Sequence, residues 1–435
     1  MQHAHIEQLS SLERRINLAV EMQTIESEVA NRLKQIARTA RVDGFRHGKV
    51  PMSLVAKQYG GEVRQEVLGN AVERAFSLAV QTHQLKVAGM PRIEPKTDAA
   101  DQSLFEFYAI FEVYPDIVLG DISAAQITRP VVGVGDAEID KTVAVLLKQR
   151  VQYKTVDRAA QADDLVTLNY TGKIDGEVFA GGEVQGFRVV LGEGRTLPDF
   201  EAALLTVKAG EQKTFDVAFP ADYQAAELAG KTAQFSAEIT AVDAPEYPAV
   251  DADFARSLGV DDGDVAKMRA EIKANLEREV KNRVLAQVKD QVMQALLTAT
   301  LVETPKSLVQ NETRRLMEQA RNDMQARGMK VADIPMPADL FEQRAQRRVA
   351  LGLILAEIVQ SKQLNAQPEQ VATMIAELAQ SYEEPQNVIN WYRETPEKMQ
   401  EMESLVLENN VVEWVLGQAK VTDQALVFDE LMGKA

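Results

Sequence analysis

The chain has 435 residues, a formal net charge of −17 and no cysteine. This length predicts about two to four domains, each large enough for its own core. The lack of cysteine excludes disulfides, thiol nucleophiles and cysteine-based metal sites, and so acidic a chain is not expected to coat nucleic acid non-specifically.

Residues 1–18 are polar and of mixed charge, without the apolar core of a signal peptide. No stretch of the chain approaches the roughly 20 apolar residues of a membrane span. The cysteine-free composition fits a reducing compartment. We therefore expect a cytoplasmic protein that is not inserted in a membrane.

Residues 1–115 are predicted to form a mixed α/β domain. Apolar residues alternate in its strand-like runs and recur at helical spacing between them. The predicted elements are a strand at 15–20, a helix at 25–40, a helix cap at Ser53 ahead of Leu54, a helix at 63–83, and a strand at 104–114 that ends at Pro115.

Between the first two helices lies the segment Gly44-Phe45-Arg46-His47-Gly48-Lys49-Val50-Pro51. Glycine allows backbone angles that other residues avoid, and proline fixes its own φ, so the segment predicts a shaped loop. Such a loop directs Phe45 outward for apolar contact and Arg46 toward a phosphate or carboxylate. The alternative is an ordinary turn with Phe45 folded into the core.

The same region is basic in an acidic chain. Residues 32–57 contain seven lysine and arginine side chains and one acidic residue, Asp43, whereas residues 1–115 hold fourteen of each sign. A basic loop of this kind can dock on one defined phosphate-rich site with salt-sensitive affinity. A solvated basic helix face is the alternative.

The pattern Gly44-Phe45-Arg46-x-Gly48-x-x-Pro51 resembles the ribosome-docking signature of the trigger factor family, the bacterial ribosome-associated chaperones. The resemblance implies a loop at the tip of the N-terminal domain that contacts protein and rRNA of the large ribosomal subunit beside the polypeptide exit. It assigns the contacts to Phe45, Arg46 and Lys49, with His47 at a variable position. The whole implied ribosome-binding set is Gly44, Phe45, Arg46, His47, Gly48, Lys49 and Pro51.

Residues 116–149 are predicted to be a linker strand followed by a helix at 136–150.

Residues 150–245 alternate short strands with glycine turns and contain one short helix. Strands that wrap about a single helix suggest a small curved sheet or half-barrel with one opening. The predicted elements are strands at 164–172, 187–192, 214–220 and 232–242, a tight turn at Asp175-Gly176, a glycine pair at 181–182, and a helix at 200–207.

The order of the aromatic residues in this segment is similar to that of the FKBP-type peptidyl-prolyl isomerases. The resemblance implies an apolar pocket for a proline ring, with a backbone N–H near Leu197 meeting the rotating carbonyl. No nucleophile, metal or cofactor is required. The implied site residues are Tyr170, Phe179, Phe187, Leu197, Phe200, Tyr223 and Phe235.

From the residues alone, the core of a small β domain is the favoured interpretation of these aromatic residues. Three positions also depart from the FKBP pattern. Ala180 follows Phe179 where many such domains carry an acid, and Asp199 and Ala203 stand where glycine is usual. Asp199 can alter the pocket rim, and a β-carbon at that position is strained if φ is positive. We therefore expect reduced or selective isomerase activity, with an inactive binding domain as the alternative.

Residues 246–435 are predicted to be helical almost throughout. Ten of the fourteen methionines lie here, and these flexible side chains suit either irregular cores or surfaces that accept many partners. The predicted helices cover 265–301 (as one long helix or two joined ones), 306–327, 340–362, 368–382, 386–392 and 396–419.

The motifs Phe341-Glu342-x-x-Ala345-x-x-Arg348-Val349 and Phe428-Asp429-Glu430-Leu431-Met432 extend the resemblance to trigger factor into this region. It implies a chaperone body whose two helical arms bind nascent and unfolded polypeptides by many weak contacts, and a self-associated form, a possible homodimer, off the ribosome. The chain has no nucleotide-binding phosphate loop, so release is expected to be independent of ATP. The histidines show no zinc-ligand spacing, so no metal site is expected.

These expectations describe a multidomain α+β protein that acts as a ribosome-associated chaperone with isomerase activity. A free folding enzyme and a pure holdase or assembly factor with a weak or inactive middle domain are the alternatives. The predicted parts are a ribosome-binding domain at 1–115, a linker region at 116–149, an FKBP-type domain at 150–245, and a helical chaperone domain at 246–435.

Overall fold

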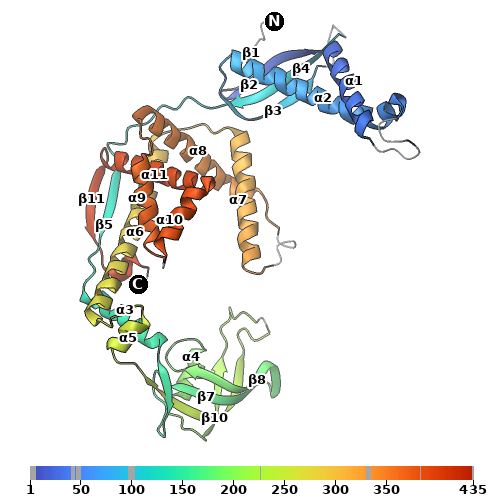
Figure 1. Cartoon of the computed structure of the whole chain (residues 1–435). Helices are drawn as coiled ribbons and strands as arrows, with labels where there is room; N and C mark the ends of the chain where they lie inside the picture. The colour runs from blue at the N-terminus through green and yellow to red at the C-terminus, as the bar shows by residue number, and fades with distance from the viewer. Residues whose placement is uncertain are drawn as a thin grey trace. The chain divides into compact units, whose positions relative to one another are not determined.

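The computed structural model describes residues 6–40, 45, 50–96, 103–225, 227–329, 335–382 and 384–433. The chain divides into two compact units, and each is built from segments that are distant in sequence (Figure 1). The first unit comprises Met1–Arg129 and Ala286–Asp423, and the second comprises Pro130–Leu285 and Gln424–Ala435.

The first unit opens with a four-stranded antiparallel sheet in the order β1-β2-β4-β3. The predicted strands at 15–20 and 104–114 and the helix at 25–40 are confirmed, whereas β1 and β3 were not predicted. The elements are β1 (Ile6–Gln8), β2 (Glu13–Glu21), α1 (Met22–Thr39), α2 (Met52–Thr82), β3 (Val87–Pro95) and β4 (Leu104–Val113).

Helix α2 corrects two predictions. The chain enters it at Pro51, whose carbonyl accepts the Leu54 N–H, so Ser53 lies inside the first turn and is not the cap. The helix then runs unbroken through the glycines at 60 and 61 into the segment predicted as a separate helix. Its valines are buried against α1 on both sides of those glycines, and this packing outweighs the poor helix propensity of glycine.

The helical part of the first unit consists of two sets of packed helices. In one set, Val309 and Leu316 of α7 share a core with Ala345 of α8. In the other, Val371 of α9 is buried with Val406 of α11. The predicted helices are confirmed as α7 (Lys306–Ala326), α8 (Asp339–Lys362), α9 (Pro368–Ala379), α10 (Pro385–Glu394) and α11 (Pro396–Leu416).

The expectation of an almost entirely helical region after residue 246 is wrong at one point. Residues Lys420–Ala425 form strand β11, which pairs with the predicted linker strand β5 (Gln126–Val131). Every residue of β11 is exposed, so its sequence carries no alternation of apolar and polar residues from which a strand is predicted.

The second unit contains a small helical cluster and a sheet. Helix α3 (Asp136–Gln149) buries Ile139 and Val143 against α5 (Ala252–Ser257) and the first part of α6 (Val265–Ala299). The prediction of α3 is confirmed, and α6 is a single helix, the first of the two alternatives predicted for 265–301. Helix α5 was not predicted. Near the end of the chain, α12 (Phe428–Leu431) packs on Val280 and Val284.

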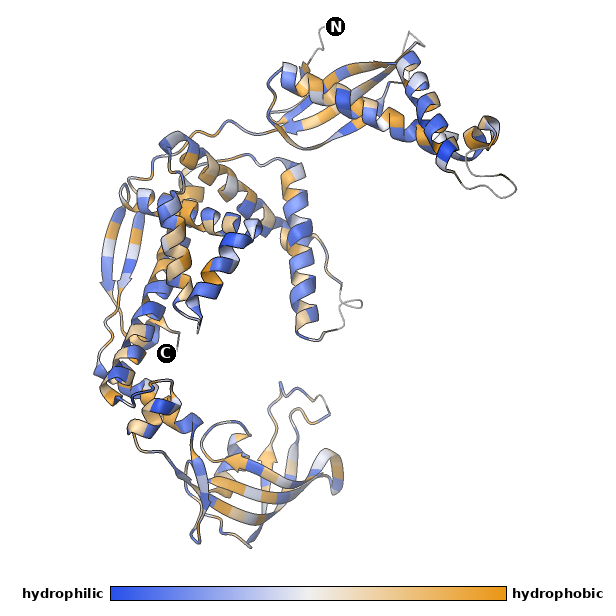
Figure 2. Cartoon of the chain, viewed as in Figure 1, coloured by the Kyte–Doolittle hydropathy of each residue, from blue (hydrophilic) through white to orange (hydrophobic). Residues whose placement is uncertain are grey.

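The sheet of the second unit is five-stranded and antiparallel, in the order β6-β10-β7-β8, with β9 also paired to β10. Hydrophobic and hydrophilic residues alternate along these strands (Figure 2), so that one face forms a core around α4. Asp175 and Gly176 both have positive φ, which confirms the tight turn. The elements are β6 (Gln152–Thr155), β7 (Leu165–Ile174), β8 (Glu177–Val190), α4 (Pro198–Leu204), β9 (Gln212–Ala218) and β10 (Thr232–Glu246).

Within the first unit, the N-terminal sheet supplies the cap of a helix that begins far along the chain. α7 starts after Pro305, which makes no side-chain cap. Instead the carboxylate of Glu112 on β4 accepts the N–H groups of Lys306 at 2.9 Å and Ser307 at 2.7 Å. The Ser307 hydroxyl donates to the Ala88 carbonyl at 2.9 Å. A carboxylate at this position stabilises the partly positive N-terminus of the helix.

This contact predicts a pH-dependent contribution to stability. Burial alone would raise the pKa of Glu112, but hydrogen bonds from Ser307 and Lys306 outweigh it and hold the pKa below its ordinary value of 4.5. The contact therefore stabilises the fold above about pH 4.5 and is lost as the pH falls through the lowered pKa. Urea titrations should show that Glu112→Gln lowers the free energy of unfolding by about 1 kcal/mol at neutral pH, and by much less at about pH 3.

Glu94→Gln is the matched control. Glu94 lies in the same sheet and forms an exposed ion pair with Arg92 at 3.2 Å. Its replacement should change the free energy of unfolding by less than about 0.5 kcal/mol. Equal losses in the two variants, or a Glu112→Gln effect that is the same at both pH values, would contradict the capping role.

Candidate functional site

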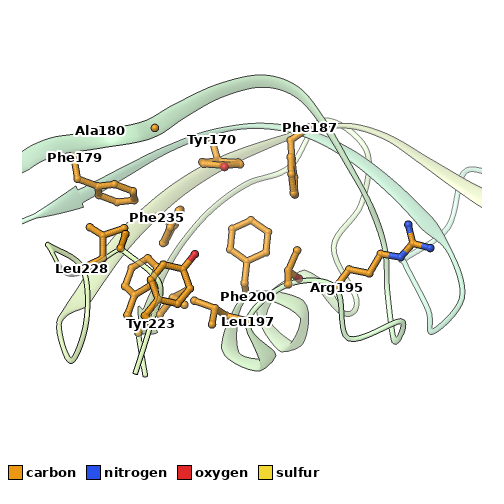
Figure 3. A pocket seen from close by; sticks show the side chains of 15 residues that line it. Tyr170, Phe179, Ala180, Phe187, Arg195, Leu197, Phe200, Tyr223, Leu228 and Phe235 are labelled. Carbon is orange, nitrogen blue, oxygen red and sulfur yellow. The ribbon is translucent and has the colours of Figure 1, made fainter. Parts of the chain in front are cut away.

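The sheet and α4 of the second unit enclose a cavity of about 420 Å³. All seven residues predicted for the isomerase site line it (Figure 3), and they come from the three strands β7, β8 and β10, from helix α4 and from two loops. Apolar side chains predominate in the lining, which suits a pocket for an apolar ring. The predicted residues in the lining are Tyr170, Phe179, Phe187, Leu197, Phe200, Tyr223 and Phe235.

Phe200 stands at the centre of this arrangement. Its ring centroid lies 5.6 Å from that of Tyr170, 5.3 Å from Phe235 and 6.1 Å from Phe187, each edge to face. Phe215 meets it from behind at 5.4 Å. Edge-to-face pairs hold rings at fixed angles and stabilise by about 0.5–1.5 kcal/mol each beyond burial. The cavity wall is therefore preformed.

The interior of the cavity is uncharged among the described residues. The one charged side chain in the lining is Arg195, which forms an ion pair with Glu193 at 2.8 Å and extends away from the rings (Figure 3). Burial, with a smaller contribution from Tyr223, raises the pKa of Tyr170. Its hydroxyl therefore stays protonated at neutral pH and is available to donate a hydrogen bond to a carbonyl.

The strain considered at Asp199 is not present, and Ala203 has the same helical conformation. Both residues lie within α4, and neither is among the described residues with positive φ. The Asp199 carboxylate instead accepts the Ala218 N–H at 3.3 Å. Ala180 does line the cavity, so the position where many FKBP-type domains carry an acid has only a methyl group here.

Sequence reasoning missed four further apolar residues in the lining, Val217, Phe219, Ala225 and Leu228. Val217 and Phe219 follow Phe215 at every second position, and the alternation along β9 was the signal that could have found them. Leu228 lies in the loop before β10, where no periodicity marks it.

The predicted ribosome-binding loop is described only in part. Phe45 is 43 % exposed, so its side chain does not fill the core as the alternative required. Val50 is buried in the core between α1 and α2, and Pro51 begins α2. The other predicted contact residues, Gly44, Arg46, His47, Gly48 and Lys49, lie outside the described residues.

Across residues 6–433, apart from the gaps given above, no cluster of His, Asp and Glu is arranged to hold a metal ion. In the same part of the chain, no helix is both long enough and apolar enough to span a bilayer.

Family models match most of the chain. Residues 2–146 match the model described as bacterial trigger factor protein (TF), and residues 264–417 match the model of the C-terminus of the same protein. Residues 156–240, which contain the cavity, match the FKBP-type peptidyl-prolyl cis-trans isomerase model.

Curated relatives agree along nearly the full length. The chain is 52 % identical over 425 residues to "Trigger factor" of Aromatoleum aromaticum, a match that covers 98 % of each chain. It is 52 % identical over 432 residues to "Trigger factor" of Nitrosospira multiformis, covering 99 % of each. With "Trigger factor" of Laribacter hongkongensis the identity is 50 % over 434 residues, with 99 % of each chain covered.

Proposed function

The chain belongs to the trigger factor family of ribosome-associated chaperones and contains an FKBP-type peptidyl-prolyl isomerase domain, and from this premise we propose how its segments divide the work. The aromatic cavity isomerises prolyl bonds. The segment 44–51 docks on the large ribosomal subunit beside the polypeptide exit, and the helices of residues 246–435 hold nascent chains.

The isomerase proposal rests on one observation, the preformed ring of aromatic side chains around Phe200. Rotation about a prolyl bond is slow because resonance holds the amide planar, with a barrier of roughly 18–20 kcal/mol. Twisting the bond breaks that resonance and leaves a more ketone-like, less polar amide. A dry apolar cavity binds the twisted form better than the planar one, which lowers the barrier.

We assign the residues by their positions in the cavity. The Phe200 ring forms the floor for the proline ring, with Tyr170 and Phe235 as adjoining walls. Tyr223 stands at the rim, 38 % exposed, with its ring 4.8 Å from that of Phe219. We assign its hydroxyl to the substrate backbone and the Leu197 N–H to the rotating carbonyl. Ala180 offers no carboxylate to that carbonyl, which supports a modest rate.

The ribosome proposal rests on the exposed Phe45 between two anchored helices. An exposed apolar side chain on a basic loop can contact ribosomal protein, while the basic residues contact rRNA phosphates. A protein that acts beside the polypeptide exit of bacterial ribosomes acts in the cytoplasm. Client release follows from weak contacts and from folding of the client, without ATP.

Co-sedimentation with 70S ribosomes tests this assignment. Wild type should pellet with ribosomes at low salt and be released as salt rises, because phosphate contacts release counterions. The triple variant Phe45/Arg46/His47→Ala removes one apolar and one cationic contact and should weaken binding by at least about tenfold.

Lys34→Ala is the matched control, since Lys34 is an exposed base on α1, outside the loop. It should pellet like wild type. If wild type stays in the supernatant at low salt, the tethering assignment fails and the protein acts as a free chaperone. If Lys34→Ala weakens binding as much as the triple variant does, general basic charge and not the loop accounts for docking.

A further inference from the structure

The loop that connects β8 to α4 forms one wall of the aromatic cavity through Arg195, Thr196 and Leu197. Two of its residues, Gly192 and Gly194, have positive φ, at +92° and +66°. Glycines in this region allow many backbone conformations. The local sequence therefore does not by itself hold this wall in one shape.

One carboxylate ties the two ends of the loop together. Glu201 on α4 is half-buried, and its Oε2 accepts the Gly192 N–H at 3.0 Å. Its Oε1 accepts the Thr196 hydroxyl at 3.2 Å and lies 3.4 Å from the Thr196 N–H. Both oxygens are thus used, one at each end of the loop. Charge-assisted bonds of this kind are roughly twice as strong as neutral ones.

The position of Glu201 links this tie to the cavity. It follows Phe200 directly, so the same turn of α4 presents the central ring to the cavity and the carboxylate to the loop. The loop bond ends at Thr196, next to the Leu197 backbone. A shift of Glu201 would therefore move the wall relative to the floor.

We propose that Glu201 is a positioning residue for prolyl isomerisation, which holds the 192–196 loop so that the Thr196-Leu197 backbone faces the twisted amide. The inference rests on the proposed isomerase function of the cavity. Preorganised polar groups lower a barrier because they need not reorient during the reaction. Small misplacement of such groups can cost up to about 100-fold in rate.

Glu201→Gln in the full-length protein is the test. Glutamine keeps the shape but has one acceptor oxygen, so one end of the loop is released. We expect kcat for a prolyl tetrapeptide, measured by NMR exchange, to fall by about tenfold. KM should change by less than about twofold, because the aromatic rings that bind the proline are untouched.

Glu211→Gln is the matched control. The Glu211 carboxylate also accepts a backbone N–H in the same unit, that of Lys208 at 2.9 Å, but does not line the cavity. A normal rate in Glu211→Gln together with a lowered kcat in Glu201→Gln supports the inference. If wild type is active and the two variants have equal rates, the positioning role is overturned while the isomerase site stands. If wild type shows no catalysis, the proposed isomerase site fails, and this role fails with it.

Discussion

Replacing Phe200 by alanine is expected to lower kcat/KM for a prolyl tetrapeptide by about 100-fold, which corresponds to about 2.7 kcal/mol of lost transition-state stabilisation. The ring is in edge-to-face contact with Tyr170, Phe187 and Phe235 and forms the floor of the cavity. Its removal opens the floor, so water enters and the cavity no longer favours the twisted amide. A protease-coupled or NMR exchange assay on the full-length chain measures the loss.

Phe200 is also part of the core, at 5 % exposure, so the same change should cost about 3–5 kcal/mol of stability. Tyr223→Ala separates the two effects because Tyr223 stands at the rim, and its loss should reduce activity with little effect on folding. Tyr153→Ala is the control for aromatic loss, since Tyr153 lies on β6 and does not line the cavity. Full activity in Phe200→Ala at a temperature where the variant is folded would contradict the assignment of the site.

The second large effect concerns stability. Asp164, 1 % exposed, is the one buried carboxylate among the described residues. It receives two hydrogen bonds from the Arg158 guanidinium, at 2.6 and 2.9 Å, and a third from the Gln161 N–H at 2.8 Å. Asp164→Ala leaves these donors without their acceptor. We expect Asp164→Ala to lower the free energy of unfolding of the second unit by about 3 kcal/mol in urea titrations.

Asp163→Asn is the neighbouring control. Asp163 is exposed and lies 3.8 Å from Lys148, and asparagine tolerates its φ of +68°. This variant should lie within about 0.5 kcal/mol of wild type. A loss of similar size in both variants would show that the turn, and not the buried hydrogen bonds of Asp164, sets the stability.

Predictions of secondary structure from the sequence were most accurate where the spacing of apolar residues agrees with the way the element packs in the fold. β10 alternates buried and exposed residues over most of its length, and Asp175-Gly176 has the residues that a tight turn demands, so both were predictable. The aromatic site was predictable as a set because its order along the chain resembles a known family. Its geometry was not, since the angles between the rings depend on strand twist and register.

The errors have physical causes. Residues 63–83 were predicted as a separate helix, but buried valines on both sides of the glycines at 60 and 61 hold α2 against α1 as one helix. β11 has no buried face, so no local pattern marks it as a strand. Strain at Asp199 was predicted only for a positive φ, and helix α4 sets that φ through contacts that the sequence does not show.

The discontinuous make-up of the two units has a consequence for biosynthesis. All strands of the isomerase sheet come from residues 152–246, so the sheet can close as soon as this stretch has emerged. The first unit needs both Met1–Arg129 and Ala286–Asp423, and the cap of α7 joins Glu112 to residues almost 200 positions later. Distant pairings of this kind form slowly. During synthesis of the protein, the isomerase sheet should therefore fold before the first unit is complete. Within the first unit, residues Met1–Arg129 cannot form their contacts with Ala286–Asp423 until those later residues have been synthesised.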